Sequence, residues 1–195
     1  VTLVHAGWAD QIEDGAYRLS LHAVRMGQAA LEQAGLGERS NHILQELVHT
    51  VHETASLAVL AGNLVRIVKR VEAEVVIRAQ VRVGTSLSLD NSSSGRVLTA
   101  FTTQEYRDLL QRNGATLAPD TLLRTVKRQG FAISSGKDVP GAQSIAMPIF
   151  DPQGICICAL SIVAPAVRFD GERYLPALLQ AAEKLNALLS GRQIS

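Results

Sequence analysis

The spacing of the apolar residues changes several times along this chain of 195 residues, and these changes constrain its fold more than any other feature. Over residues 20–51 apolar side chains recur every three or four positions, which is typical of amphipathic helices. Residues 54–83 are rich in Val, Ile and Leu and favour antiparallel strands. Helical spacing returns over residues 95–130, and a hairpin (144–163) and a helix (172–189) follow. Groups of strands between groups of helices predict an α+β fold rather than a doubly wound parallel sheet.

Turn and cap residues mark where several of these elements end. The sequence Asp-Pro-Gln-Gly at residues 151–154, between two apolar runs, is the strongest hairpin signal. Gly62-Asn63 separates two further strands. Thr102, followed by Glu105 three residues later, has the pattern of a capping box and predicts a helix start. Gly130 predicts the end of the helix that follows.

The first 20 residues are rich in turns. Short extended pieces around the acidic turn at Asp14 and Gly15 predict a β-hairpin, which by itself is too small to hold a core. Because Val1 already lies inside an amphipathic stretch, we expect the chain to be a fragment of a longer protein.

Charge and composition narrow the classes of function. Lys and Arg number 19 against 18 Asp and Glu, which gives a net charge of +1, and aromatic residues make up only 4%. Free-standing nucleic-acid binders usually have a basic excess, and single-strand binders stack bases on aromatic rings. The composition argues against both. No apolar run is long enough for a transmembrane helix and no signal peptide is recognisable, so we expect a cytoplasmic protein without membrane contact.

Four polar residues share one stripe of the second predicted helix. His42, Glu46, His49 and Glu53 are spaced i, i+4, i+7 and i+11, opposite the apolar face. Two imidazoles and two carboxylates can bind zinc, so a small metal-dependent enzyme is one alternative function. A closed site would need ligands from elsewhere in the chain, which favours a solvated or subunit-facing surface. We therefore expect no metal ion.

Catalytic signatures are absent from the sequence. Cys156 and Cys158 alternate along one predicted strand, where they are poorly placed to form a disulfide and are expected to be small apolar side chains. No histidine follows His52, so a serine or cysteine nucleophile in the later part of the chain would need a base from the N-terminal helices. Walker, dinucleotide and zinc-protease motifs are also missing. The sequence therefore predicts neither an enzyme nor a bound cofactor.

Small hydroxyl side chains gather in residues 86–96, just before a short predicted helix that contains Gly95. Backbone N–H groups at a helix start, together with serine hydroxyls, can bind a carboxylate or a phosphate. Alternatively, Asp90, Asn91 or Ser92 is simply the N-cap of the helix. The spacing alone leaves both interpretations open.

Six segments in a fixed order give the chain its resemblance to a known family. They are Gly7-Trp8 with Gly15-Ala16-Tyr17-Arg18-Leu19; Leu21 to Leu31; Glu53 to Leu60; Gly130-Phe131-Ala132; Pro140-Gly141 with Ile145-Ala146 and Pro148-Ile149-Phe150-Asp151; and Ala159-Leu160-Ser161-Ile162 with Pro165. With these segments the chain resembles the IclR family of bacterial transcription regulators over essentially its whole length.

The resemblance implies a domain organisation and a function. Residues 1–20 would be the remnant of a winged helix-turn-helix, residues 21–36 a linker helix, and residues 37–195 a GAF-like (profilin-like) effector-binding domain with a central antiparallel sheet between helices. A small effector, expected to be an organic acid, would modulate operator binding. DNA would be bound through the missing helix-turn-helix, and the protein would be a homodimer or homotetramer. The apolar stripe of Leu21, Val24 and Leu31 supports such pairing.

The resemblance also implies a set of ligand-binding residues. The positions that bind small carboxylates in family members correspond here to Ser93, Ser94, Ser134, Ser144, Ser161 and Val163. Hydroxyls can donate hydrogen bonds to a carboxylate. The family's usual His and Lys near this helix are Asp90 and Arg96 here, and Val163 lacks the donor found in relatives, so the identity of the ligand does not carry over.

A stand-alone GAF-like small-molecule sensor is the second alternative. The wing-like segment at residues 1–20 argues against it. A helix-turn-helix pattern encoded upstream of the chain would decide for the regulator.

Overall fold

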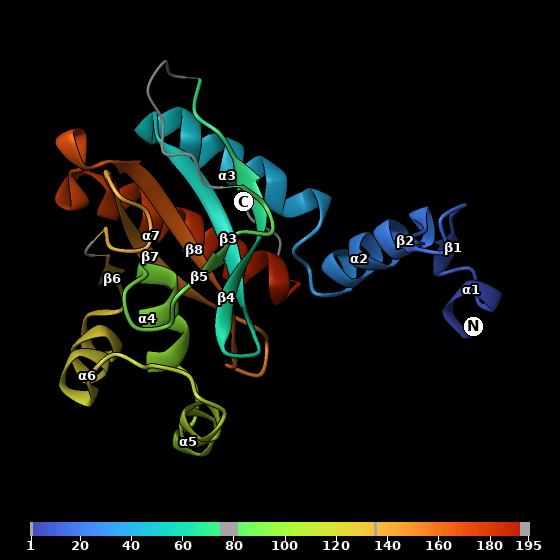
Figure 1. Ribbon diagram of the computed structural model, residues 1–195. Helices are drawn as coiled ribbons and strands as arrows, with labels where there is room; N and C mark the ends of the chain where they lie inside the picture. Colours follow the sequence, from blue (N-terminus) through green and yellow to red (C-terminus); the bar gives the residue numbers. More distant parts are fainter. Residues whose placement is uncertain (1, 75–81, 135, 192–195) are drawn as a thin grey trace. The chain divides into compact units, whose positions relative to one another are not determined.

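The computed structural model describes residues 2–74, 82–134 and 136–191 and divides into two compact units, residues 1–40 and 41–195 (Figure 1). The second unit combines an antiparallel sheet with helices, which confirms the predicted α+β class.

The first unit contains a hairpin between two helices. Strands β1 (Ala9–Gln11) and β2 (Tyr17–Leu19) pair antiparallel, as the sequence predicts. Helix α1 (Thr2–His5) precedes them, although the sequence indicates only turns and extended pieces there. Helix α2 (Leu21–Gln33) follows and falls within the predicted helix at residues 20–36.

The surface of α2 is apolar in places. None of its residues, all of which the structure describes, is buried, and Leu21 and Val24 are 81% and 55% exposed.

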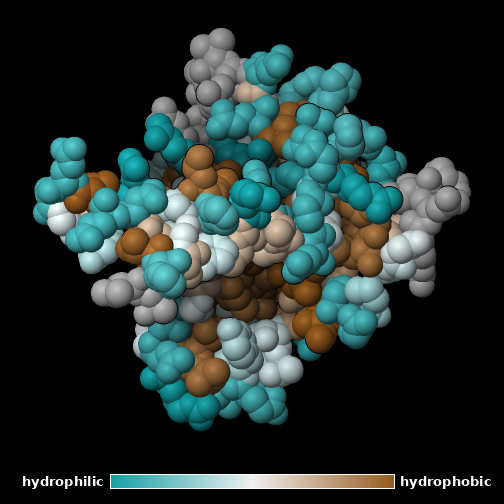
Figure 2. Space-filling view, turned by 90° about the vertical axis from the view of Figure 1, so that its right-hand side faces the viewer, coloured by the Kyte–Doolittle hydropathy of each residue, from teal (hydrophilic) through white to brown (hydrophobic). Residues whose placement is uncertain are grey.

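The second unit also has large apolar side chains at its surface, which include Tyr106 and Ile155. Figure 2 shows hydrophobic residues between hydrophilic ones on one face of the molecule.

A six-stranded antiparallel sheet forms the centre of the second unit. Its strands are β3 (Thr54–Ala61), β4 (Leu64–Val71), β5 (Ser86–Leu87), β6 (Ala132–Ile133), β7 (Ala142–Phe150) and β8 (Cys156–Pro165). They lie in the order β5-β4-β3-β8-β7-β6, so the two long hairpins join through β3 and β8. The strand predicted over residues 74–83 falls largely on residues 75–81, outside the described residues.

Helices flank this sheet: α4 (Ser93–Ala100) packs on one face and α6 (Asp120–Gln129) packs on α4. The other helices of the unit are α3 (Glu38–Val51), α5 (Gln104–Arg112) and α7 (Gly171–Leu189), with a 3₁₀ turn (Ala166–Arg168) before α7. Ala146 and Ala159 share a buried cluster with Val97 of α4. Their neighbours along the strands, Ile145 and Leu160, are fully buried and point to the opposite face, because successive strand residues alternate. That face is covered by α7, which packs on β7 and β8.

The hairpin turn of β7 and β8 is stabilised by its own side chain. Asp151 Oδ1 accepts hydrogen bonds from the amides of Gln153 and Ile155, at 2.9 and 2.8 Å. Gly154 adopts a φ of +80°, a conformation that residues with a Cβ rarely adopt. The predicted turn is confirmed.

Two details of the helices differ from expectation. The N-cap of α5 is Thr103, whose hydroxyl accepts from the Tyr106 amide, rather than the predicted Thr102. On α7, whose apolar residues include both Leu178 and Leu179, Leu178 is fully buried together with Tyr174, whereas Leu179 is 45% exposed. Several registers of a helix surface are similarly apolar, so packing against the sheet decides the side that is buried.

Candidate functional site

A pocket lies where the start of α4 meets the ends of β7 and β8. Its cavity volume is only about 30 Å³, within a hollow of about 470 Å³ that is partly open to solvent. Its walls come from the segment before and at the start of α4, the loop after β6, the strands β7 and β8, and single residues of β4 and β5. The lining residues are Ile67, Leu87, Asn91, Ser92, Ser94, Ser134, Gly136, Asp138, Val139, Ala142, Gln143, Ser144, Ser161 and Val163.

Ser92 positions the start of α4. It is the N-cap: its hydroxyl accepts a hydrogen bond from the Gly95 amide at 2.9 Å and donates to the Ser88 carbonyl at 2.6 Å. Gly95 allows the preceding loop to pack closely, because a Cβ there would lie 2.4 Å from Ser88 O and 2.6 Å from Leu89 Cα. The N-cap interpretation of this loop therefore holds for Ser92, and it leaves Ser93 and Ser94 for other roles.

The serines of the neighbouring strand face this helix start. Ser93 Oγ and Ser144 Oγ are 2.6 Å apart and share a hydrogen bond. Ser134 Oγ accepts from the Ser144 amide at 2.9 Å, while the Ser134 amide donates to the Ser144 carbonyl at 2.8 Å. Three residues that are far apart in sequence thus form one connected polar cluster.

Strand register brings two further predicted residues to the same face. Val163 pairs with Ser144 across β7 and β8, and Ser161 pairs with Ala146. Directly opposed residues of antiparallel strands share a face of the sheet. Of the six positions implied by the family resemblance, all but Ser93 line the pocket, and Ser93 is hydrogen-bonded to a lining residue. The geometry brings the set together, and its role in binding stays a prediction.

An aspartate that the sequence did not single out ties down the loop over the pocket. Asp138 accepts hydrogen bonds from the amide and the hydroxyl of Ser88, each at 2.8 Å. Arg96 holds the other side, because its guanidinium donates to the carbonyls of Asp90 and Ile133, both at 2.7 Å. No local pattern marks Asp138, because its partner lies 50 residues away in the chain.

The predicted histidine stripe is divided by the end of a helix. Helix α3 stops at Val51, and His52 has a positive φ of 57°, so Glu53 is no longer on the helical stripe. The buried Glu53 carboxylate instead accepts two hydrogen bonds from the Arg168 guanidinium, from Nε to Oε1 at 2.5 Å and from Nη2 to Oε2 at 3.0 Å. These hydrogen bonds raise the pKa of Arg168. Among the residues that the structure describes, no three His, Cys, Asp or Glu side chains are grouped to hold a metal ion.

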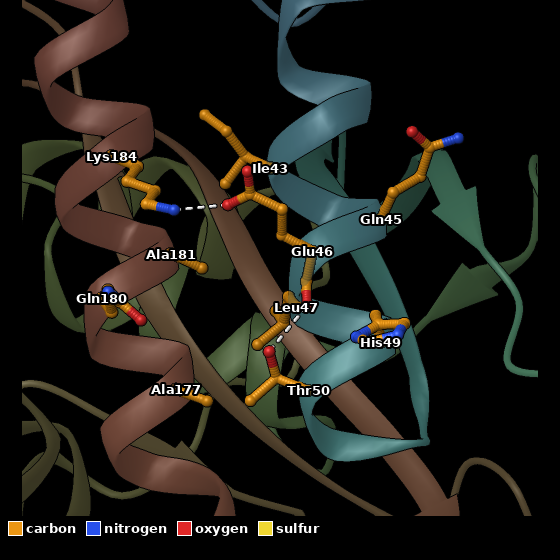
Figure 3. Close-up of a pocket in the computed structure, with 10 residues that line it drawn as sticks. All are labelled: Ile43, Gln45, Glu46, Leu47, His49, Thr50, Ala177, Gln180, Ala181 and Lys184. Carbon is orange, nitrogen blue, oxygen red and sulfur yellow. Dashed lines mark hydrogen bonds and ion pairs between the residues drawn. The ribbon is translucent and has the colours of Figure 1, made fainter. Parts of the chain in front are cut away.

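The rest of that stripe borders a groove between α3 and α7 (Figure 3). Glu46 forms an ion pair with Lys184 across the groove, and His49 lies farther along its α3 side. His42 is exposed and does not line the groove. An ion pair therefore links the two helices across the groove, and only Glu46 and His49 of the four stripe residues line it.

The two cysteines have the environment of core residues. Burial raises the pKa of Cys156 to about 12, against the lowering effect of a hydrogen bond with the backbone of Ile149. Burial, followed by the neighbouring Cys156, also raises the pKa of Cys158. Both thiols are protonated at neutral pH, whereas a nucleophilic cysteine needs a lowered pKa.

Residues 28–187 match the family model described as bacterial transcriptional regulator IclR C-terminal. The chain belongs to the IclR family. The match begins inside α2 and covers the sheet with its helices, and it identifies the second unit as the GAF-like effector-binding domain of a bacterial transcription regulator.

Named relatives and solved structures agree with this assignment. The Pca regulon regulatory protein of Pseudomonas putida is 31% identical over 207 residues, covering 97% of this chain and 70% of that protein. A candidate IclR regulator from Silicibacter sp. TM1040 shares the fold with a TM-score of 0.85 at 23% identity, covering 97% and 80% of the two chains. An IclR homologue from Microbacterium hydrocarbonoxydans, complexed with 4-hydroxybenzoate, is 26% identical with a TM-score of 0.76, covering 97% and 82%.

These relatives are transcription regulators or their homologues. In the part of the chain that the structure describes, no helix has the length and apolar character needed to cross a lipid bilayer.

Proposed function

We propose that the pocket between α4, β7 and β8 binds a small organic acid, and that this acid modulates the binding of the regulator to DNA. The observation that carries the proposal is the cluster of Ser93, Ser134 and Ser144 at the start of α4, with Ser161 on the same pocket wall. The 4-hydroxybenzoate complex of an IclR homologue supports an acid as the ligand class.

The chemistry of this end of the pocket suits a carboxylate. The first N–H groups of α4 and the partial positive charge of the helix start favour an anion. Ser93 and Ser144 now bond to one another, and either hydroxyl can turn to donate to a carboxylate oxygen instead. A carboxylate would therefore exchange one neutral hydrogen bond for charge-assisted ones, which are stronger.

In this proposal regulation arises because binding of the acid and binding of DNA are thermodynamically linked. The acid would stabilise one arrangement of the effector domains, and the linker helix at residues 21–36 would transmit it to the DNA-binding heads. In this proposal residues 1–20 belong to the winged helix-turn-helix and residues 37–195 to the effector domain. The protein acts in the cytoplasm and binds rather than transforms its ligand.

A homodimer or homotetramer is part of the proposal. The exposed apolar side chains Leu21 and Val24 on α2 support it, because an apolar stripe of a helix is favourable when a partner covers it. Sedimentation analysis measures the oligomeric state of the chain and of the double variant Leu21→Gln/Val24→Gln. A chain that is strictly monomeric at high concentration would contradict the pairing.

A thermal-shift screen of oxo, hydroxy, sugar and aromatic acids tests the ligand site. An acid at about 100 times its Kd should add about 2.7 kcal/mol to the unfolding free energy. Ser144→Val removes a pocket hydroxyl on a strand that accepts valine, and it should abolish the shift. Thr121→Val, on the exposed side of α6 away from the pocket, is the matched control. An unchanged shift in Ser144→Val would place the acid elsewhere.

A further inference from the structure

One serine of the sheet has an unusual environment. Ser56 of β3 is fully buried, and its Oγ has no hydrogen-bond partner among the described residues. The pocket serines Ser93, Ser134 and Ser144 are all hydrogen-bonded. A buried hydroxyl without a partner destabilises a folded protein, so its presence calls for a physical reason.

Register places Ser56 on the side of the sheet that faces α4. Ser56 is directly opposite Ser161 of β8 and, on its other side, directly opposite Arg70 of β4. Ser161 lines the pocket, and so does Ile67, three residues before Arg70 on the same strand. The two strands that flank Ser56 therefore each contribute a lining residue, Ser161 opposite Ser56 itself and Ile67 opposite its neighbour Ala58, while Ser56 is fully buried between them and does not itself line the pocket.

Polar residues occupy only one end of this face. Ser56, Ser161 and Arg70 make a row across three strands, and the Arg70 side chain is 3% exposed, with its Nε 3.3 Å from Glu72 Oε1. The next row, Ala58 and Ala159, belongs to the apolar cluster beneath α4. The polar row is therefore a local feature of the sheet, and it reaches the pocket through Ser161.

We propose that Ser56 binds a second oxygen of the effector, a hydroxyl or carbonyl remote from its carboxylate. This inference rests on the proposed function of the pocket and adds the ligand's second polar group to it. Ser56 Oγ donates to, or accepts from, that oxygen, with Ser161 beside it. The preferred ligand is thus a hydroxy or oxo acid, because an acid with a plain hydrocarbon end leaves the Ser56 hydroxyl buried and unpaired.

Calorimetric titration with matched pairs of acids tests this. The pairs are 4-hydroxybenzoate with benzoate and 3-hydroxybutyrate with butyrate. We expect the wild-type chain to bind the hydroxylated member of at least one pair about fivefold more tightly. Ser56→Ala should remove that preference and bind the unhydroxylated member within about twofold of wild type. Ser144→Ala, at the carboxylate end, should weaken both members equally.

A second measurement uses no ligand. Since the Ser56 hydroxyl lacks a partner among the described residues, Ser56→Ala should keep or raise the melting temperature of the unliganded chain. A melting temperature lowered by several degrees would show a structural bond to that hydroxyl and overturn the inference.

The outcomes separate the two proposals. A preference that survives Ser56→Ala, or an equal loss for both members of a pair, overturns the role of Ser56 alone. Unchanged binding in Ser144→Ala overturns the carboxylate position alone. If no acid binds the wild-type chain at millimolar concentration, the proposed function fails and the role of Ser56 fails with it.

Discussion

Ser93 on α4 and Ser144 on β7 share a 2.6 Å hydrogen bond across 51 residues of sequence. This bond joins the helix start to the sheet at the mouth of the proposed acid site. Both hydroxyls would have to re-orient when a carboxylate binds. Substitutions of this pair should therefore change both the stability of the unliganded chain and its affinity for the acid.

A double-mutant cycle on this pair measures the bond. Ser93→Ala and Ser144→Ala should each lower the unfolding free energy by about 1 kcal/mol, and the double variant should lose little more than either single variant. Urea denaturation provides the values. Fully additive losses would show that the two hydroxyls do not interact.

Gly95→Ala should destabilise the second unit. The added Cβ would meet the backbone of Ser88 and Leu89 at 2.4 and 2.6 Å, and backbone has little freedom to move away. Overpacking of this kind costs about 1–3 kcal/mol. Gly27→Ala is the matched control, because its Cβ meets nothing within 4 Å and alanine is the better helix former. Equal melting curves for Gly95→Ala and wild type would contradict the close contact.

Asp138→Ala should loosen the loop over the pocket without unfolding the domain. The Ser88 amide donates to Asp138 Oδ2 at 2.8 Å, so its hydrogen exchange should become faster when the carboxylate is removed. Exchange measured by mass spectrometry on peptides that contain residues 86–92 and 136–141 checks this. Lys137→Ala, a change at the exposed neighbour, serves as control and should leave the rate at Ser88 unchanged.

Stability should fall in alkaline solution partly through Cys156. Its pKa rises from an ordinary value of 9.0 to about 12 on folding, so the folded chain keeps a proton that the unfolded chain has already lost. The contribution is complete below pH 9 and declines as the pH rises toward 12. Between about pH 8 and pH 10.5, wild type should lose about 1–2 kcal/mol more than Cys156→Ala in urea denaturation. Parallel pH profiles for the two chains would count against a buried thiol.

Local chemistry explains the elements that the sequence predicted well. The turn at residues 151–154 needs only the Asp151 carboxylate and a glycine with positive φ, both encoded within four residues. The helix stop at Gly130, with its φ of 83°, is equally local. The cap of α5 was misplaced by one residue because Thr102 and Thr103 are both suitable caps, and only the path of the chain from α4 decides between them.

In the candidate site, too, some features follow from local sequence and others only from tertiary packing. Family motifs place Ser93, Ser144 and Ser161 in one candidate set; in the structure Ser144 and Ser161 line one pocket, and Ser93 is hydrogen-bonded to Ser144. The histidine stripe was plausible on an ideal helix, but Glu53 lies past the helix end and pairs with Arg168, 115 residues away. Sequence spacing is informative only as long as the helix continues.

Periodicity, turn residues and short motifs are local properties, and they suffice to predict the α+β class, the hairpins, the helix limits within a few residues and the family. Tertiary packing was needed to show that Asp138 holds Ser88, and that the Oγ of Ser56 has no hydrogen-bond partner among the residues that the structure describes. The face to which Ser56 points depends on its pairing with Ser161, 105 residues later, and a shift of one residue in that register would turn it to the other side of the sheet.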